Sequence, residues 1–373
     1  MNVFCISIDG LHCGMIGAYG NTWIQTPTLD ALACQSVLFD RFYTETLELT
    51  AIFDSIWQLN QRKDRMILLT DDDEIFLHAK ANEFDKRYRL KPFRDRQPVQ
   101  TLEETQFFNS FAAALDLFLE QKRSVKSCFL WAHFQGFRGR WDFPIQYREM
   151  YQADEDPAPY PGVELPRVFL PNTPNTPNTP NVNLPNKMNT EIDPDKIQSV
   201  METYAGGVTV LDQALAGLLD SFEEGELGNE TLFLFVSTRG FSLGEHGRIG
   251  ADDNLYGENL QLPLFVRFPD GFGASVRVPA LFRSDDLASF LNNLSDNDSP
   301  VFNLVREKTE MIHETLRITG KSGSVLVTPD WFFRKMLDGR SELYVKPDDR
   351  WEANDVADRC PEIVEELVRY FEV

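Results

Sequence analysis

The chain has 373 residues, 42% hydrophobic and 25% charged, which is typical of a globular protein with two domains or one large domain with an appendage. Acidic residues number 58 and basic residues 36, so the net charge is −22. A field of that sign disfavours nucleic acid, anionic membranes and polyanionic glycans as partners. The five cysteines are scattered and form no CxxC pair, so neither a disulfide framework nor a zinc knuckle is indicated.

The first element in chain order is a strand. Residues Val3–Ile8 form an apolar run of the kind found in buried parallel sheets. Thr26 and Pro27 then predict the start of a helix, with Thr26 as the cap and Pro27 in the first helical position. No apolar run reaches the roughly 18 residues of a membrane helix, and the N-terminus lacks the basic region of a signal peptide. We therefore expect a cytoplasmic protein.

Further strands and helices alternate along the chain. Apolar runs predict strands and spacings of three and four predict helices. The predicted strands are Met66–Thr70, Cys128–Phe134, Leu232–Ser237 and Leu262–Phe268, and the helices are Phe107–Lys122 and Met201–Glu224. This alternation indicates an α/β fold with a mostly parallel sheet flanked by helices, which binds ligands at the carboxyl ends of its strands.

Two segments interrupt the alternation. Residues 151–195 include an NTP repeat and the nine of the 21 prolines that lie between Pro157 and Pro185, and they predict a surface insertion. Beyond about residue 272, short strand patterns and a terminal helix begun by Pro361 predict a smaller α+β subdomain. We therefore divide the chain into an α/β domain, 1–271, and a C-terminal subdomain, 272–373.

Three stretches resemble motifs of one family. They are ISIDGLHCGMIGAYGNTWIQTPTLDALA near the N-terminus, VSTRGFSLGEHG followed by LPLFVRFPDG, and SELYVKPDDRWEANDVADRC near the C-terminus. In this order they resemble the sulfatase family of the alkaline-phosphatase superfamily. The resemblance implies an alkaline-phosphatase-like fold and hydrolysis of sulfuric esters. It also implies a calcium or magnesium ion held by carboxylates, a formylglycine nucleophile made from a CxPxR-type motif, and lysine and histidine residues that bind the sulfate.

Most positions that the family uses carry other residues here. Asp9 matches the first metal-binding aspartate, but Gly10 replaces the second. In the loop after Ser237, Thr238 occupies the position of a metal-binding aspartate of the family, and Arg239 occupies the position of its next metal ligand. The nucleophile position falls near Leu49, and the sequence contains neither CxPxR nor SxPxR. We therefore expect no bound cofactor.

Other residues of the motifs invite a functional interpretation. Arg138 stands where the family has a sulfate-binding histidine, and His246 lies in the GEHG motif, where a packing role is favoured over catalysis. The acidic run Asp71–Glu74 is interpreted as a strand end followed by a helix start, and not as a calcium site. The basic stretch Lys86–Arg96 is interpreted as surface charge compensated by neighbouring acids.

Two hypotheses follow. The first is a catalytically inactive protein in which Arg239 replaces the cation and pairs with Asp9, and which binds a small anion or a protein partner. The second is an active sulfuric ester hydrolase or metal-dependent phosphodiesterase with a non-standard site. It would need calcium, magnesium or zinc and an unusual nucleophile, for which Thr44, Thr46 and Thr50 are the candidates. The five histidines show no metal-ligand spacing, which favours the first hypothesis.

Overall fold

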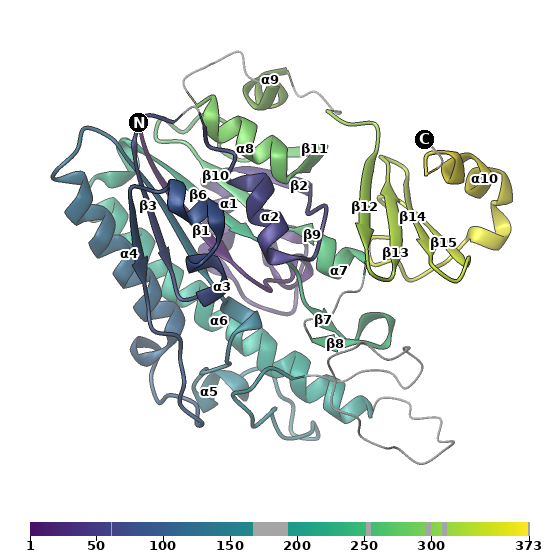
Figure 1. Cartoon of the computed structure of the whole chain (residues 1–373). Helices are drawn as coiled ribbons and strands as arrows, with labels where there is room; N and C mark the ends of the chain where they lie inside the picture. Colours follow the sequence, from purple (N-terminus) through teal and green to yellow (C-terminus); the bar gives the residue numbers. More distant parts are fainter. Residues whose placement is uncertain (61, 167–192, 251–254, 295–299, 308–311, 372–373) are drawn as a thin grey trace.

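A large mixed sheet forms the centre of the molecule in the computed structural model, which describes residues 1–60, 62–166, 193–250, 255–294, 300–307 and 312–371 (Figure 1). Among these residues the sheet has nine strands, in the order β11-β2-β10-β6-β1-β5-β3-β4, with β9 paired to β2. The strands are β1 (Asn2–Ile8), β2 (Val37–Tyr43), β3 (Arg65–Thr70), β4 (Lys86–Arg89), β5 (Cys128–Phe134), β6 (Thr231–Ser237), β9 (Gln261–Leu262), β10 (Leu264–Arg267) and β11 (Val276–Arg283). Strands β6, β1, β5, β3 and β4 run parallel. The predicted fold class is confirmed.

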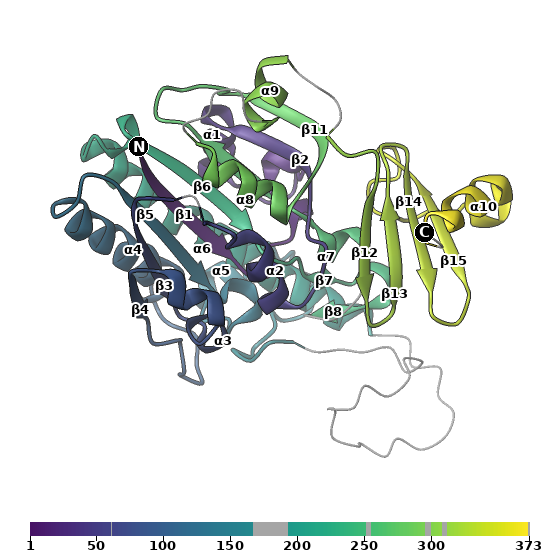
Figure 2. The same ribbon diagram turned by 45° about the horizontal axis from the view of Figure 1, so that its top comes forward.

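Helices cover both faces of this sheet (Figures 1 and 2). Along β1, Phe4, Ile6 and Ile8 join one buried cluster, and Val3 and Cys5 join the other. This alternation is the two-residue period of a strand buried on both sides. The first cluster contains α1 (Pro27–Gln35), α4 (Gln106–Lys122) and α6 (Pro194–Glu224), and the second contains α2 (Leu49–Ile56), α8 (Ser284–Asn292) and α9 (Pro300–Glu307).

Short elements connect the sheet to its helices. They are α3 (Asp73–Phe76), α5 (Ile145–Arg148), α7 (Gly257–Leu260) and the two-stranded ribbon β7 (Ser242–Leu243) and β8 (Ile249–Gly250). The loops at the carboxyl ends of β1, β3, β5 and β6 meet at one edge of the sheet, where the candidate site lies.

A four-stranded antiparallel sheet stands beside the large one (Figure 2). Its strands are β12 (Leu316–Gly320), β13 (Gly323–Val327), β14 (Trp331–Met336) and β15 (Ser341–Val345), and α10 (Pro361–Arg369) packs on it. The predicted subdomain began at residue 272, but β11 pairs with β2 in the large sheet. By sheet membership the second unit starts only at Leu316, because the apolar residues of β11 are buried in the main core.

Three details differ from the predictions. Thr26 accepts a hydrogen bond from the Gly17 amide (2.9 Å) and leaves the cap of α1 to Asp212, whose carboxylate accepts from the amides of Thr28 and Leu29. The predicted strand Leu262–Phe268 is divided into β9 and β10 at a proline, which cannot donate to the ladder. Helix α6 begins at Pro194, seven residues before the predicted start.

The predicted insertion, 151–195, lies in part outside the described residues, which exclude 167–192. Its described beginning packs against the body of the protein. The guanidinium of the buried Arg148 donates to the carbonyls of Trp141, Tyr160 and Gly162. All five cysteines of the chain are free thiols.

Candidate functional site

Asp9 follows β1 at the edge where parallel strands end, and it is almost fully buried (1% exposed). The loop after β6 lies beside it and supplies its partners. Arg239 donates through Nε to Oδ1 of Asp9 (3.0 Å) and through a terminal nitrogen to Oδ2, and Thr238 donates its hydroxyl to Oδ1 (3.0 Å). The ion pair expected from the residue exchange is therefore present, and the fork of the guanidinium matches both carboxylate oxygens.

The electrostatics of this pair follow from burial and charge. Burial raises the pKa of Asp9, but the charge and hydrogen bonds of Arg239, together with the charge of Arg138, outweigh it and hold the pKa below its usual value. Burial likewise lowers the pKa of Arg239, and the charge of Asp9 reverses that effect. Both groups are therefore ionised at neutral pH.

Gly10 and Arg138 occupy the space beside Asp9. Gly10 has a φ of +82°, and a Cβ added there would lie 2.8 Å from Cγ of Arg138. The Arg138 guanidinium donates to the carbonyl of Gly240 (3.0 and 3.2 Å) and lies 3.8 Å from Oδ1 of Asp9. A second aspartate at position 10 would meet both a left-handed backbone and the arginine side chain.

Leu49 is the first residue of α2 and is buried in the core. The chain just before it reaches the site, because Arg239 donates its remaining terminal nitrogen to the carbonyl of Leu47 (3.1 Å). The backbone two residues before the inferred nucleophile position thus contacts Arg239, and the position itself carries an inert side chain buried in the core.

Two of the threonines proposed as nucleophiles in the second hypothesis form hydrogen bonds within the local turn. The hydroxyl of Thr44 donates to the carbonyl of Thr46, and the hydroxyl of Thr46 accepts from the amide of Glu48. Thr50 lies half-buried in the first turn of α2. None of these contacts involves a base that would activate a hydroxyl.

The residues present do not fit a divalent metal ion. Asp9 is the one carboxylate among the four positions expected to hold it, and both of its oxygens already accept from Arg239. Among the described residues no group of three or more His, Cys, Asp or Glu side chains is placed to bind a metal. Calcium and magnesium need several oxygen ligands. Here the guanidinium of Arg239 is the cation beside Asp9 in place of a metal ion.

His246, in the turn between β7 and β8, contacts the segment around α7 and the C-terminal unit. Its ring stacks on Tyr256 (3.5 Å between centroids), Nδ1 lies 3.3 Å from Glu258, and Nε2 lies 3.0 Å from the carbonyl of Glu352. Burial lowers its pKa, but the hydrogen bond and charge of Glu258 raise it above the usual value. These contacts join the β7–β8 ribbon, the segment around α7 and the C-terminal unit.

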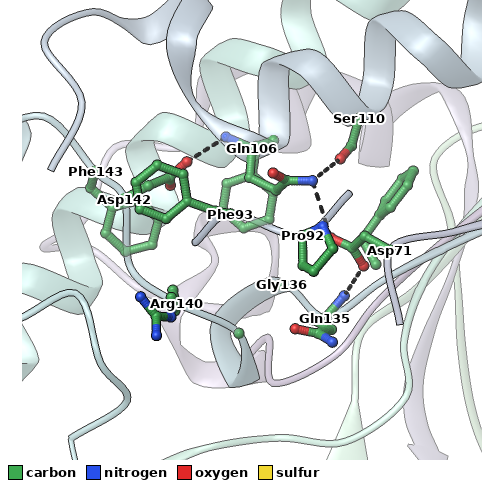
Figure 3. Close-up of a pocket in the computed structure, with 13 residues that line it drawn as sticks. Asp71, Pro92, Phe93, Gln106, Ser110, Gln135, Gly136, Arg140, Asp142 and Phe143 are labelled. Carbon is green, nitrogen blue, oxygen red and sulfur yellow. Dashed lines mark hydrogen bonds between the residues drawn. The ribbon is translucent and has the colours of Figure 1, made fainter. Parts of the chain in front are cut away.

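Asp71, at the end of β3, is a second buried carboxylate on this edge, which was interpreted from the sequence only as the start of an acidic run. Its oxygens accept from the amide of Gln135 (2.9 Å) and the side chain of Gln106 (3.3 Å), and no cation touches it among the described residues (Figure 3). Burial raises its pKa to about 7. It lines a cavity of about 20 Å³, large enough for one water, together with Asp142, whose pKa burial raises to about 6.

The rest of the acidic run behaves as the sequence predicts. Asp72 caps α3 by accepting from the amides of Glu74 and Ile75, and Asp73 pairs with Arg89 of the basic stretch. His133, at the end of β5, is fully buried with Nδ1 3.0 Å from the hydroxyl of Ser7. Burial lowers its pKa to about 4, so the imidazole is neutral.

Comparisons with known proteins agree with this architecture. The family model described as Sulfatase matches residues 70–296, well over half of the chain. A 94-residue stretch is 34% identical to an N-acetylglucosamine-6-O-sulfatase of Bacteroides thetaiotaomicron, and it covers 25% of this chain and 16% of that enzyme. The matched part is thus a small fraction of that relative. In the described part of this chain no helix is long and apolar enough to cross a bilayer.

Solved structures share the fold over the whole chain. A protein whose structure was solved in complex with its substrate, D-glucosamine-2-N,6-O-disulfate, has a TM-score of 0.72 at 15% identity, with 100% of this chain and 96% of that chain covered. The phosphonate monoester hydrolase of Agrobacterium radiobacter has a TM-score of 0.70 at 15% identity, with 100% and 94% covered. The chain belongs to the sulfatase family, within the alkaline-phosphatase-like superfamily.

Proposed function

We propose that this chain is a catalytically inactive member of the sulfatase family, a pseudoenzyme that acts through binding. The observation that carries the proposal is the bidentate pair of Arg239 with Asp9, in the place where the family holds its metal. The guanidinium supplies the positive charge that the buried carboxylate requires, so the fold keeps its aspartate without a metal.

Electrostatics oppose a divalent ion and this arginine in one site. At a separation of about 4 Å and an effective dielectric of about 20, their direct repulsion is on the order of 8 kcal/mol. The arginine is also fixed by a third contact, to the carbonyl of Leu47, so leaving the site would break three hydrogen bonds. The absence of a cysteine or serine in a CxPxR-type motif removes the formylglycine nucleophile as well.

The contacts of Arg239 bear on which kind of ligand the inactive protein would bind. Three of the five N–H groups of the Arg239 guanidinium already donate to Asp9 and Leu47, so a small anion would find only the remaining two, beside the negative charge of Asp9. We therefore propose that a protein partner or a ligand bound elsewhere is the more productive target. A cytoplasmic location remains the prediction from the sequence alone.

The proposal is tested by hydrolysis assays with an aryl sulfate, a phosphodiester and a phosphonate monoester, each with calcium, magnesium, manganese or zinc. The matched control is Asp9→Asn, because any contaminating hydrolase would act equally in both preparations. We expect the same background rate in both proteins. Turnover by the wild type that disappears in Asp9→Asn would overturn the proposal and support the active alternative.

A further inference from the structure

An open pocket lies at the start of α6, apart from the Asp9 site. Its volume is about 460 Å³, and its described lining includes no lysine, arginine or histidine. Its lining includes the aromatic residues Trp23 and Tyr151, called the aromatic wall, and the carboxyl groups of Asp156 and Glu202, called the acidic wall. Gln198 and Met201 lie beside these groups in the lining.

The aromatic wall is rigid before any ligand arrives. Trp23 is 40% exposed, and its ring meets that of Tyr151 edge to face, with 5.3 Å between centroids. The hydroxyl of Tyr151 accepts from the amide of Gln25 and shares a hydrogen bond with Thr209 (2.7 Å). Asn21 fixes the turn that carries the tryptophan by accepting from its amide. Aromatic faces held in this way attract cations.

The acidic wall contains an unsatisfied buried oxygen. Glu202 is 2% exposed, and Gln198 donates to its Oε1 (2.8 Å). Its buried Oε2 accepts no well-aligned hydrogen bond among the described residues, although the side chains of Gln152 and Asp156 lie close enough to influence the pKa of Glu202. Asp156 lies next to it, half-buried, with Oδ2 held by the amide of Ala153. Burial and the charge of Asp156 both raise the pKa of Glu202, as expected for two neighbouring carboxyl groups.

We infer that this pocket binds an organic ammonium ion, with the charged head against Asp156 and Glu202 and the alkyl part on Trp23 and Tyr151. Two neighbouring carboxyl groups are stabilised either by sharing a proton or by a cation between them, and an ammonium ion supplies both charge and hydrogen-bond donors. The aromatic wall and Met201 suit the methylene groups next to that head, which a bare metal ion lacks. The overall charge of −22 favours the approach of cations. The inference does not depend on the state of the Asp9 site.

The test is calorimetric titration of the full chain with n-butylammonium chloride at low ionic strength, with 1-butanol as the uncharged probe. We expect saturable binding of the ammonium ion and none of the alcohol. Glu202→Gln keeps the shape and removes the charge, so it should weaken binding about tenfold or more. Trp23→Ala should weaken it by a smaller factor, about threefold.

The control is Asp220→Asn, which makes the same charge change at an exposed position on the same helix, about 27 Å along its axis. It should leave the affinity unchanged, and the unfolding midpoint of each variant shows that it is folded. The inference is overturned if the ammonium ion does not saturate, if 1-butanol binds equally well, or if Glu202→Gln and Asp220→Asn weaken binding to the same extent.

Discussion

Asp9 and Asp71 are buried carboxylates at the ends of β1 and β3, two strands that flank β5 on the same edge of the sheet. Asp9 has an arginine against both oxygens, and its pKa is held below the usual value. Asp71 accepts from two neutral donors, and its pKa is raised to about 7. Both are almost fully buried, so the difference comes from the charges around them, which are a guanidinium beside Asp9 and neutral donors with the carboxylate of Asp72 beside Asp71.

The comparison shows how this fold keeps a buried aspartate charged through an arginine beside it. Neutral hydrogen bonds do not compensate the lost hydration of a buried carboxylate, whereas a fixed guanidinium does. The two residues should therefore respond to acid in opposite ways. The stabilisation from Asp9 is lost as the pH falls through its low pKa, and that from Asp71 is lost as the pH rises through about 7.

The largest expected effect is that of removing the cation from the Asp9 site. Arg239→Ala leaves a buried carboxylate without its partner and should lower the free energy of unfolding by about 3–5 kcal/mol. Urea denaturation at pH 7 measures it. The control is Arg340→Ala, an exposed arginine paired with Asp338, which should cost less than about 1 kcal/mol. Equal effects of the two substitutions would show that the Asp9 pair is no stronger than a surface pair.

Asp71 should produce the next largest effect, as a dependence of stability on pH. Its pKa is about 7 in the folded protein and near 4 when unfolded, so the folded state binds its proton more tightly. Its contribution is present in full below about pH 4 and is lost as the pH rises through 7, at most about 4 kcal/mol.

Asp71→Asn removes that titration. Urea denaturation of both proteins at pH 5 and pH 8 should show a smaller loss of stability in the variant. The comparison with the wild type is necessary because burial also raises the pKa values of Glu45 and Glu352 to about 7. Identical losses in the two proteins would mean that Asp71 is ionised at both pH values.

A smaller effect is expected at Gly10, where the arginine has taken the space of the second aspartate. Gly10→Ala adds a Cβ at a φ of +82° and 2.8 Å from Arg138, and should cost about 2–3 kcal/mol. Gly271→Ala is the matched control, because its φ is +71° and no atom lies within 4 Å of the added carbon. Its cost should be about 1 kcal/mol, the backbone part alone. If the two costs agree, Arg138 does not restrict position 10.

The smallest effect is predicted for Arg138, whose Nε lies 3.8 Å from Oδ1 of Asp9, farther than the nitrogens of Arg239. Arg138→Ala should lower the free energy of unfolding by about 1–2 kcal/mol, mainly through its lost bonds to the carbonyl of Gly240. The pKa of Asp9, followed by carboxyl NMR, should rise less than in Arg239→Ala. A larger rise than in Arg239→Ala would reverse the assigned roles of the two arginines.

Much of the main sheet could be predicted, because its strands are apolar runs with a clear period. The Asp9–Arg239 pair could be predicted as well, since the family motifs place both residues at neighbouring strand ends. The cap of α1 could not, because Asp212 is more than 180 residues away from the amides that it accepts. The place of β11 depends on its pairing with β2, which no local pattern reveals.

The properties of Asp71 show the same limit. Its acidic neighbours in the sequence suggested a helix start, and Asp72 does cap α3. The pKa of Asp71, however, depends on which donors face it, and these come from Gln106 and Gln135 on two other segments. The sequence marks the carboxylate, whereas the charge around it is known only from the fold.

The most direct test of the central claim is the metal content of the chain, measured by elemental analysis after dialysis against calcium and magnesium and removal of the free ions. The account predicts far less than one divalent ion per chain, because Arg239 already neutralises Asp9. One ion per chain that is lost in Asp9→Asn would contradict it, and would mean that the arginine leaves the site when a metal binds.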